Sequence, residues 1–75
     1  MQELVAFVAR SLVENPDAVF VREVEGPESI IVELRVAPED MGKVIGKQGR
    51  IAKAIRAVVK AATPRDSKPV FLEIV

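Results

Sequence analysis

The first part of the chain has a helical spacing of hydrophobic residues. Residues 3–14 are predicted to form a helix, because apolar side chains recur every three or four positions on one face. The Asn15-Pro16-Asp17 cluster ends this pattern, since such residues favour turns over helix. The sequence therefore begins with one amphipathic helix. Its expected buried face carries Leu4, Val5, Val8 and Leu12.

Two segments with the character of β-strands follow. Residues 18–25 are rich in β-branched and aromatic side chains, although their inward face is not evident. Residues 29–36 alternate between apolar and polar positions, and a Gly26-Pro27 turn lies between the two segments. We therefore expect an antiparallel hairpin with one buried face. In its second strand the apolar side carries Ile30, Val32, Leu34 and Val36.

The second half of the chain predicts two further helices. Pro38 and the acids Glu39-Asp40 are typical of a helix start, and this short helix can run to about Ile45. Gly46-Lys47-Gln48-Gly49 then interrupts it, and a second helix runs from Arg50 to about Ala62. The second helix is amphipathic. Its apolar stripe is Ile51, Ile55, Val58, Val59 and Ala62, and its basic side is Arg50, Lys53, Arg56 and Lys60.

The last segment closes the predicted fold. Thr63-Pro64 ends the second helix, a polar loop runs to Pro69, and residues 70–75 form a strand. Because this strand reaches the sheet through a helical crossover, we expect it to lie parallel to strand 29–36. The predicted order is α-β-β-α-α-β. This is an α+β fold, with a three-stranded mixed sheet packed against three helices in a single domain over residues 1–75.

Composition then narrows the possible functions. A chain of 75 residues has no room for a second core, and it contains no cysteine, histidine, tryptophan or tyrosine. An imidazole base, a thiol nucleophile and a His- or Cys-rich metal site are therefore excluded. We expect a binding protein that is not an enzyme and has no metal or cofactor. The first residues resemble neither a secretory signal nor a membrane span, so a cytoplasmic location is expected.

The net charge of zero conceals an uneven distribution. Residues 1–40 hold nine acids and three bases, a balance of −6, and residues 41–75 hold eight bases and two acids, a balance of +6. Such a division can mark an anion-binding half. It can equally be a solvated face that the other half neutralises after folding. The charge pattern alone leaves both interpretations open.

The segment with the clearest chemistry is the Gly46-Lys47-Gln48-Gly49 loop. Two glycines let the backbone reverse sharply and approach a ligand closely. The helix that begins at Arg50 directs its unpaired N–H groups and its positive dipole end at this loop, and the nearby lysine and arginine add full charges. A phosphodiester backbone would fit there. Walker and dinucleotide-binding motifs do not match, whereas a helix-turn corner without a ligand remains the alternative.

The context of this loop resembles the K-homology (KH) domain of RNA-binding proteins. The segment VIGKQGRI (residues 44–51) is similar to the core of that family, V-I-G-x-x-G-x-I. The element order, with a helix and a hairpin first, looks like the type II arrangement, and the resemblance covers nearly the whole chain. A chain made of one such domain is similar to the small stand-alone bacterial KH proteins of the KhpA type.

The resemblance implies a binding site for about four single-stranded nucleotides. The loop residues Gly46, Lys47, Gln48 and Gly49 would hold the phosphates, flanked by Lys43 and Arg50, with Lys53 one turn further on. Candidates for an apolar groove floor are Val44, Ile45 and Ile51, for which plain core packing is the alternative, with Leu72 or Phe71 as the opposite wall. The loop over residues 63–69 corresponds to the variable loop of the family, where Arg65 and Lys68 are candidate RNA contacts. Core packing is expected for Phe7, Phe20 and Phe71, and a solvated face for Arg56 and Lys60.

The same resemblance implies a biological role. Proteins of this type act on single-stranded RNA as chaperones or post-transcriptional regulators, linked to cell shape, cell wall biogenesis and envelope regulation. It also implies a protein partner, which would be a larger KH-containing protein of the Jag type, a second copy of the chain, or both. The alternative is a KH-fold dimerisation or adaptor module whose RNA contact is incidental. No membrane partner is expected.

Overall fold

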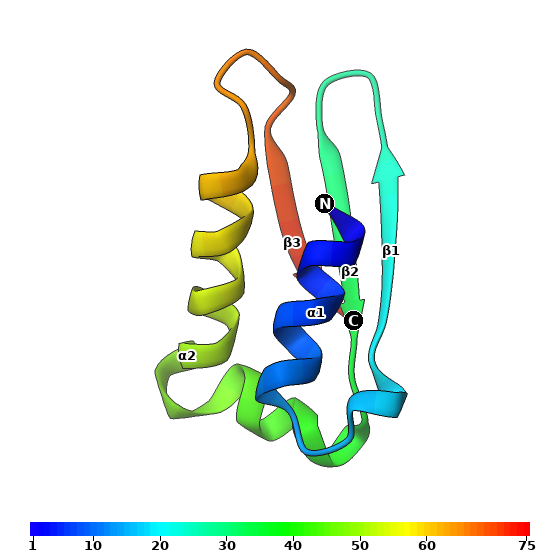
Figure 1. Ribbon diagram of the computed structural model, residues 1–75, viewed down its shortest axis with the longest axis vertical. Coiled ribbons are helices and arrows are strands. Elements are labelled where there is room, and N and C mark those ends of the chain that lie inside the picture. Colours follow the sequence, from blue (N-terminus) through cyan, green and yellow to red (C-terminus); the bar gives the residue numbers. More distant parts are fainter.

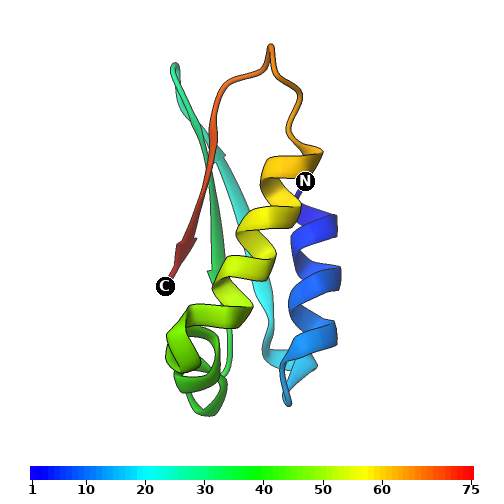
Figure 2. The same cartoon turned by 90° about the vertical axis from the view of Figure 1, so that its left-hand side faces the viewer.

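The computed structural model describes residues 1–75, apart from the side chains of Lys47 and Gln48. A three-stranded sheet forms one layer, and both α-helices cover the same face of it (Figures 1 and 2). This arrangement confirms the expected α+β fold. The elements in chain order are α1 (Gln2–Leu12), the short 3-10 helix η1 (Pro16–Ala18), β1 (Phe20–Glu25), β2 (Ile30–Arg35), α2 (Pro38–Ala62) and β3 (Val70–Ile74).

The strands lie in the order β1-β2-β3, so β2 is central and β3 has a free edge. β1 and β2 are antiparallel, with Phe20 opposite Arg35. β3 runs parallel to β2, with Val70 opposite Ile30. Both pairings confirm the sequence prediction. The parallel pairing follows from the helical connection, because α2 returns the chain to the end of the sheet where β2 begins.

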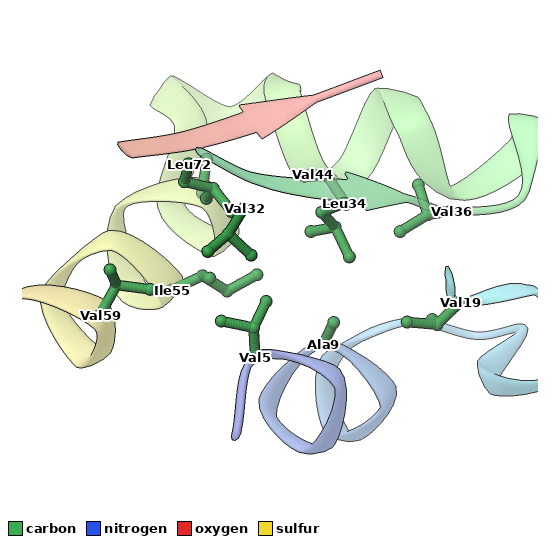
Figure 3. Packing of buried hydrophobic residues seen from close by; sticks show 11 residues of the cluster. Val5, Ala9, Val19, Val32, Leu34, Val36, Val44, Ile55, Val59 and Leu72 are labelled. Carbon is green, nitrogen blue, oxygen red and sulfur yellow. The ribbon is translucent and has the colours of Figure 1, made fainter. Parts of the chain in front are cut away.

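The hydrophobic core lies between the inner face of the sheet and the two helices. Side chains of the central strand point toward those of α1 and α2 (Figure 3). Val32 and Leu34 of β2, Val5 of α1 and Ile55 of α2 are fully buried. The alternation predicted for β2 is therefore correct. The cluster also includes Ala9, Val19, Val36, Val44, Ala52, Val59 and Leu72.

The face of α1 that packs on the sheet differs from the expected one. Val5 and Ala9 are fully buried, whereas Leu4 and Leu12 are exposed. The buried stripe of α1 consists of Val5, Ala6 and Ala9, and so it includes alanines that the hydrophobic pattern did not count. Small side chains at a contact allow two elements to approach closely, and the larger leucines then lie outside it.

All three phenylalanines are exposed, so the expectation that they pack in the core is wrong. Their exposed fractions are 70% for Phe7, 65% for Phe20 and 54% for Phe71. Phe20 and Phe71 lie on the face of the sheet that the helices leave uncovered, since they alternate with residues directed inward. In a domain this small, the aliphatic side chains between the sheet and the helices already fill the core.

The two helices expected around the glycine loop are two arms of one helical element, α2: a first arm over residues 38–45 and a second arm over residues 50–62. Gly49 has φ = +68°, in the left-handed region. One such residue redirects the axis of a right-handed helix, and only glycine adopts it at little cost. The ribbon accordingly turns a corner between the green and the yellow parts of α2 (Figure 1). The predicted interruption is present, but as a corner within one helix.

Candidate nucleic-acid interface

The corner of α2 presents an open stretch of backbone. Among the described residues, and apart from the adjacent residues and the backbone of the helix itself, no atom lies within 4 Å of the position that a Cβ atom would take at Gly46 or Gly49. No other part of the described chain therefore covers the backbone at these two glycines. The predicted contacts of the Lys47 and Gln48 side chains lie outside the described residues.

The cations predicted to flank the loop differ in their surroundings. Arg50 and Lys53 are exposed on the second arm of α2. Lys43 is exposed on the first arm, but its ammonium forms an ion pair with the carboxylate of Glu14. An anionic ligand would have to share or displace this carboxylate to use the charge of Lys43.

A buried carboxylate fixes the first arm of α2 against the end of α1. Asp40 is fully buried, and it accepts the backbone N–H of Glu14 at Oδ1 and that of Asn15 at Oδ2, both at 3.0 Å. Burial raises the pKa of Asp40, but these hydrogen bonds and the charge of Lys43 lower it by more, so the net pKa is below the ordinary value. The sequence suggested only a helix-start role for this residue.

The three candidates for an apolar groove floor, taken together with Leu72 of the opposite wall, separate into two pairs. Val44 is fully buried and Leu72 is nearly so, and both belong to the core cluster. Their side chains therefore offer a ligand almost no surface. Ile45 has 58% of its surface exposed, and Ile51 is half-buried. Of the four candidates, only this second pair has surface available beside the corner.

A groove of about 880 Å³ lies between the second arm of α2, the loop over residues 63–69 and β3. Its lining includes apolar side chains at Val59 and Val70, with the cations Arg56, Lys60 and Arg65. Arg56 and Lys60 are exposed, as expected for a solvated face, and they also line this groove, which the sequence did not predict. One sequence feature could have pointed to the groove. The cations of the second arm, from Arg50 to Lys60, extend from the corner toward it.

The free edge of β3 adds backbone groups to this groove. Pro69 O accepts the N–H of Ile30, and Val75 N–H donates to Leu34 O. Odd-numbered residues of β3 thus direct their backbone groups to β2. Because successive residues alternate, the N–H and C=O of Leu72 point to the open edge. Leu72 also lines the groove, so a donor and an acceptor lie beside it.

Folding neutralises part of the basic half of the chain and leaves part available. Two ion pairs, Lys43–Glu14 and Lys68–Glu25, join the two halves. Among the described side chains, the cations of the second arm and Arg65 of the following loop form no ion pair. The interpretation that folding neutralises this charge is therefore correct in part, and the anion-binding interpretation stays a prediction. In the second arm and this loop, the described cations without an ion pair are Arg50, Lys53, Arg56, Lys60 and Arg65.

This arrangement can hold a polyanion by positive charge and an exposed backbone, and its groove can accept flat apolar groups. Across the described part of the chain, no cluster of three or more acids could bind a metal ion. Within the same residues, neither helix has an apolar stretch of the length that a membrane span requires.

Comparison with known proteins identifies the family. The sequence model described as "KhpA/KhpB, KH domain" matches residues 2–74. The chain is 64% identical over 75 residues to the RNA-binding protein KhpA of Caldanaerobacter subterraneus subsp. tengcongensis, and 65% identical over 75 residues to that of Clostridium perfringens, covering all of both chains in each case. With the KhpA of Aquifex aeolicus it shares 47% over 74 residues, which cover 99% of this chain and 94% of the relative. No solved structure matches the chain.

These relatives are named for binding and not for a reaction. The family is non-enzymatic, which confirms the expectation from composition that the chain is not an enzyme.

Proposed function

Because the chain belongs to the KhpA/KhpB family of KH domains, we propose that it binds single-stranded RNA along the second arm of α2. The phosphates would lie at the corner from Gly46 to Gly49, with Lys43, Arg50 and Lys53 beside them. The bases would follow the groove toward the loop over residues 63–69. The observation that carries this proposal is that one helical arm bears the glycine corner at its start and a groove lined by Arg56, Lys60 and Arg65 at its end.

Three features of the site suit a single strand better than a duplex. The corner accommodates one backbone, and a KH loop of this type clamps about four nucleotides. Ile45 and Ile51 offer apolar surface next to the phosphate position. The open N–H and C=O of Leu72 match a base edge that carries one acceptor and one donor. An unpaired base can reach these groups, whereas a base in a duplex already uses its edge for pairing.

In the cell, this binding would serve an RNA chaperone or a post-transcriptional regulator in the cytoplasm. By resemblance to the family, the regulated processes would be cell shape, cell wall biogenesis and the envelope. Supporting this assignment are the family match and the RNA-binding relatives, which share the full length of the chain.

A second candidate function is a dimerisation or adaptor module, formed with another copy or with a larger KH-containing protein of the Jag type. It is favoured by exposed apolar side chains on α1, where Leu4 and Phe7 lie outside the core. The two functions are compatible, because joining two weak RNA sites raises the apparent affinity. Light scattering from micromolar to high micromolar concentration, with and without a KH-containing partner, tests the association. A strict monomer that retains no such partner would contradict it.

The RNA site is tested by replacing two loop residues together, Lys47→Asp and Gln48→Asp. We expect the variant to lose affinity for labelled single-stranded RNA while its thermal melt stays close to that of the parent, because carboxylates there repel phosphate. A matched control, Arg10→Asp with Ser11→Asp, makes the same net charge change on exposed positions of α1. Unchanged affinity in the folded loop variant would refute the assignment.

A further inference from the structure

The loop over residues 63–69 forms one end of the groove, and a lysine ties it to the β1–β2 hairpin. We propose that Lys68 and Glu25 are a positioning pair that holds this loop as the fixed end wall of the RNA groove. The inference rests on the proposed function, since it assigns a role within the same site. It differs from the expectation that Lys68 contacts RNA directly.

The ammonium of Lys68 makes two contacts outside its own loop. It donates to Glu25 Oε2 at 2.7 Å and to the backbone oxygen of Gly26 at 2.9 Å. Gly26 is itself held in the hairpin turn, because its N–H donates to Ser29 O at 2.8 Å. Lys68 therefore binds a rigid part of the fold more than forty positions away in sequence. The hydrogen bond and charge of Lys68 also hold the pKa of Glu25 below its ordinary value.

Other hydrogen bonds shape the loop and fix its two ends, but they do not hold the middle of the loop against the hairpin. Thr63 Oγ1 donates to Val59 O at 2.6 Å, and Ser67 N–H donates to Pro64 O at 3.2 Å. These bonds shape the turn internally. At the far end, Ile30 N–H donates to Pro69 O at 2.9 Å and starts the pairing of β3. Lys68 supplies the only side-chain hydrogen bonds, among the described residues, between this loop and the hairpin.

The directions of the loop side chains show which residue can contact RNA and which one only holds the loop. Ser67 and Pro69, on either side of Lys68, both line the groove together with Arg65. The ammonium of Lys68 is instead engaged at the hairpin, where two of its three donors are used. The residue that can reach a phosphate from this loop is therefore Arg65, and Lys68 acts by holding it in place.

The size of the effect follows from exposure. Lys68 is half-buried and Glu25 is exposed, so their ion pair is a modest interaction. Losing it would free the loop to move and would lower the fraction of molecules with a formed groove. We expect the dissociation constant for RNA to rise by roughly two- to fivefold, the range that an exposed ion pair can transmit.

The test compares Lys68→Met, Glu25→Gln and the double variant in titrations of labelled single-stranded RNA over a range of salt concentrations. We expect each single variant to weaken binding, the double variant to be no weaker than either, and the salt slope to stay at the parental value. Arg65→Gln is the control for a phosphate contact, and it should reduce the slope by about 0.7. A Glu25→Gln variant that binds RNA more tightly, or a Lys68→Met variant with a reduced slope, would overturn the proposal in favour of direct contact.

A second measurement examines the free protein. Hydrogen exchange of the Ser67 amide should be faster in both single variants than in the parent, whether or not RNA is bound. Unchanged exchange together with unchanged affinity would overturn the positioning pair while leaving the RNA site intact. A parent protein that does not bind RNA would instead refute the proposed function, and with it the role of this pair in a groove.

Discussion

Lys43, on the first arm of α2, is held in an ion pair by Glu14, which follows α1. The two residues are 29 positions apart, and both side chains are at least partly exposed. If Lys43 faces RNA as proposed, the carboxylate of Glu14 would compete with phosphate for its ammonium.

We therefore expect Glu14→Gln to bind single-stranded RNA more tightly than the parent. An exposed ion pair contributes up to about 1 kcal/mol, which corresponds to a decrease in the dissociation constant of roughly two- to fivefold. Titration of labelled RNA at low salt measures this change, and Glu28→Gln, on the exposed hairpin turn, is the control. Equal affinity in parent and variant would mean that Lys43 does not reach the RNA.

The buried carboxylate of Asp40 predicts a dependence of stability on acid. Its pKa in the folded protein is below the ordinary value, because the hydrogen bonds from Glu14 and Asn15 outweigh the effect of burial. The folded state therefore binds fewer protons than the unfolded state in acid. The stability that Asp40 contributes is present above the pKa of an unfolded aspartate, about 3.9, and is lost as the pH falls through its folded pKa.

Thermal melts between about pH 7 and pH 2 test this effect. We expect Asp40→Asn to melt lower than the parent at pH 7, because it removes the charged acceptor, and to lose less stability on acidification. Asp66→Asn, on an exposed loop position, should follow the parental curve. Parallel curves for Asp40→Asn and the parent would show that this carboxylate does not contribute to the acid transition.

The glycines of α2 should respond differently to alanine. Gly49→Ala places a side chain at φ = +68° and should lower the free energy of unfolding by about 1–2 kcal/mol. Each kcal/mol corresponds to a fall of about 4–8 °C in melting temperature. Gly46→Ala has open space for its methyl group and should gain up to about 1 kcal/mol. The same methyl group lies where a phosphate would approach, so we expect this stabilised variant to bind RNA less tightly.

Gly42→Ala is the matched control, because it lies on the first arm of α2, also with open space around it. It should gain similar stability and keep the parental affinity. If Gly46→Ala bound RNA as well as Gly42→Ala does, the corner would not be the place of close phosphate approach.

Binding should be weak, sensitive to salt and selective for single strands. A clamp that neutralises three or four phosphates, each contributing about −0.7, gives a slope of roughly −2 to −3 in a plot of log affinity against log salt concentration. Titrations of one RNA sequence, alone and annealed to its complement, measure both properties. A slope near zero or a preference for the duplex would contradict the proposed mechanism.

Local patterns in the sequence determined the elements of this protein and their pairing. The alternation of Val32 and Leu34 identified the buried side of β2, because a strand with one covered face must alternate with period two. The glycine spacing at Gly46 and Gly49 located the corner, because few other residues permit such a reversal. The fold class and the candidate loop could be predicted for these reasons.

Only the tertiary structure decided which surfaces are used. The burial of Ala9 in place of Leu4 and Leu12 depends on how α1 packs on the sheet, and the exposure of Phe20 depends on which sheet face the helices cover. The same holds for charges: Lys68 and Glu25 meet because the loop after α2 and the β1–β2 turn lie at one end of the sheet (Figure 1). Such contacts join residues distant in the chain, and no local period records them, since they arise from how whole elements pack.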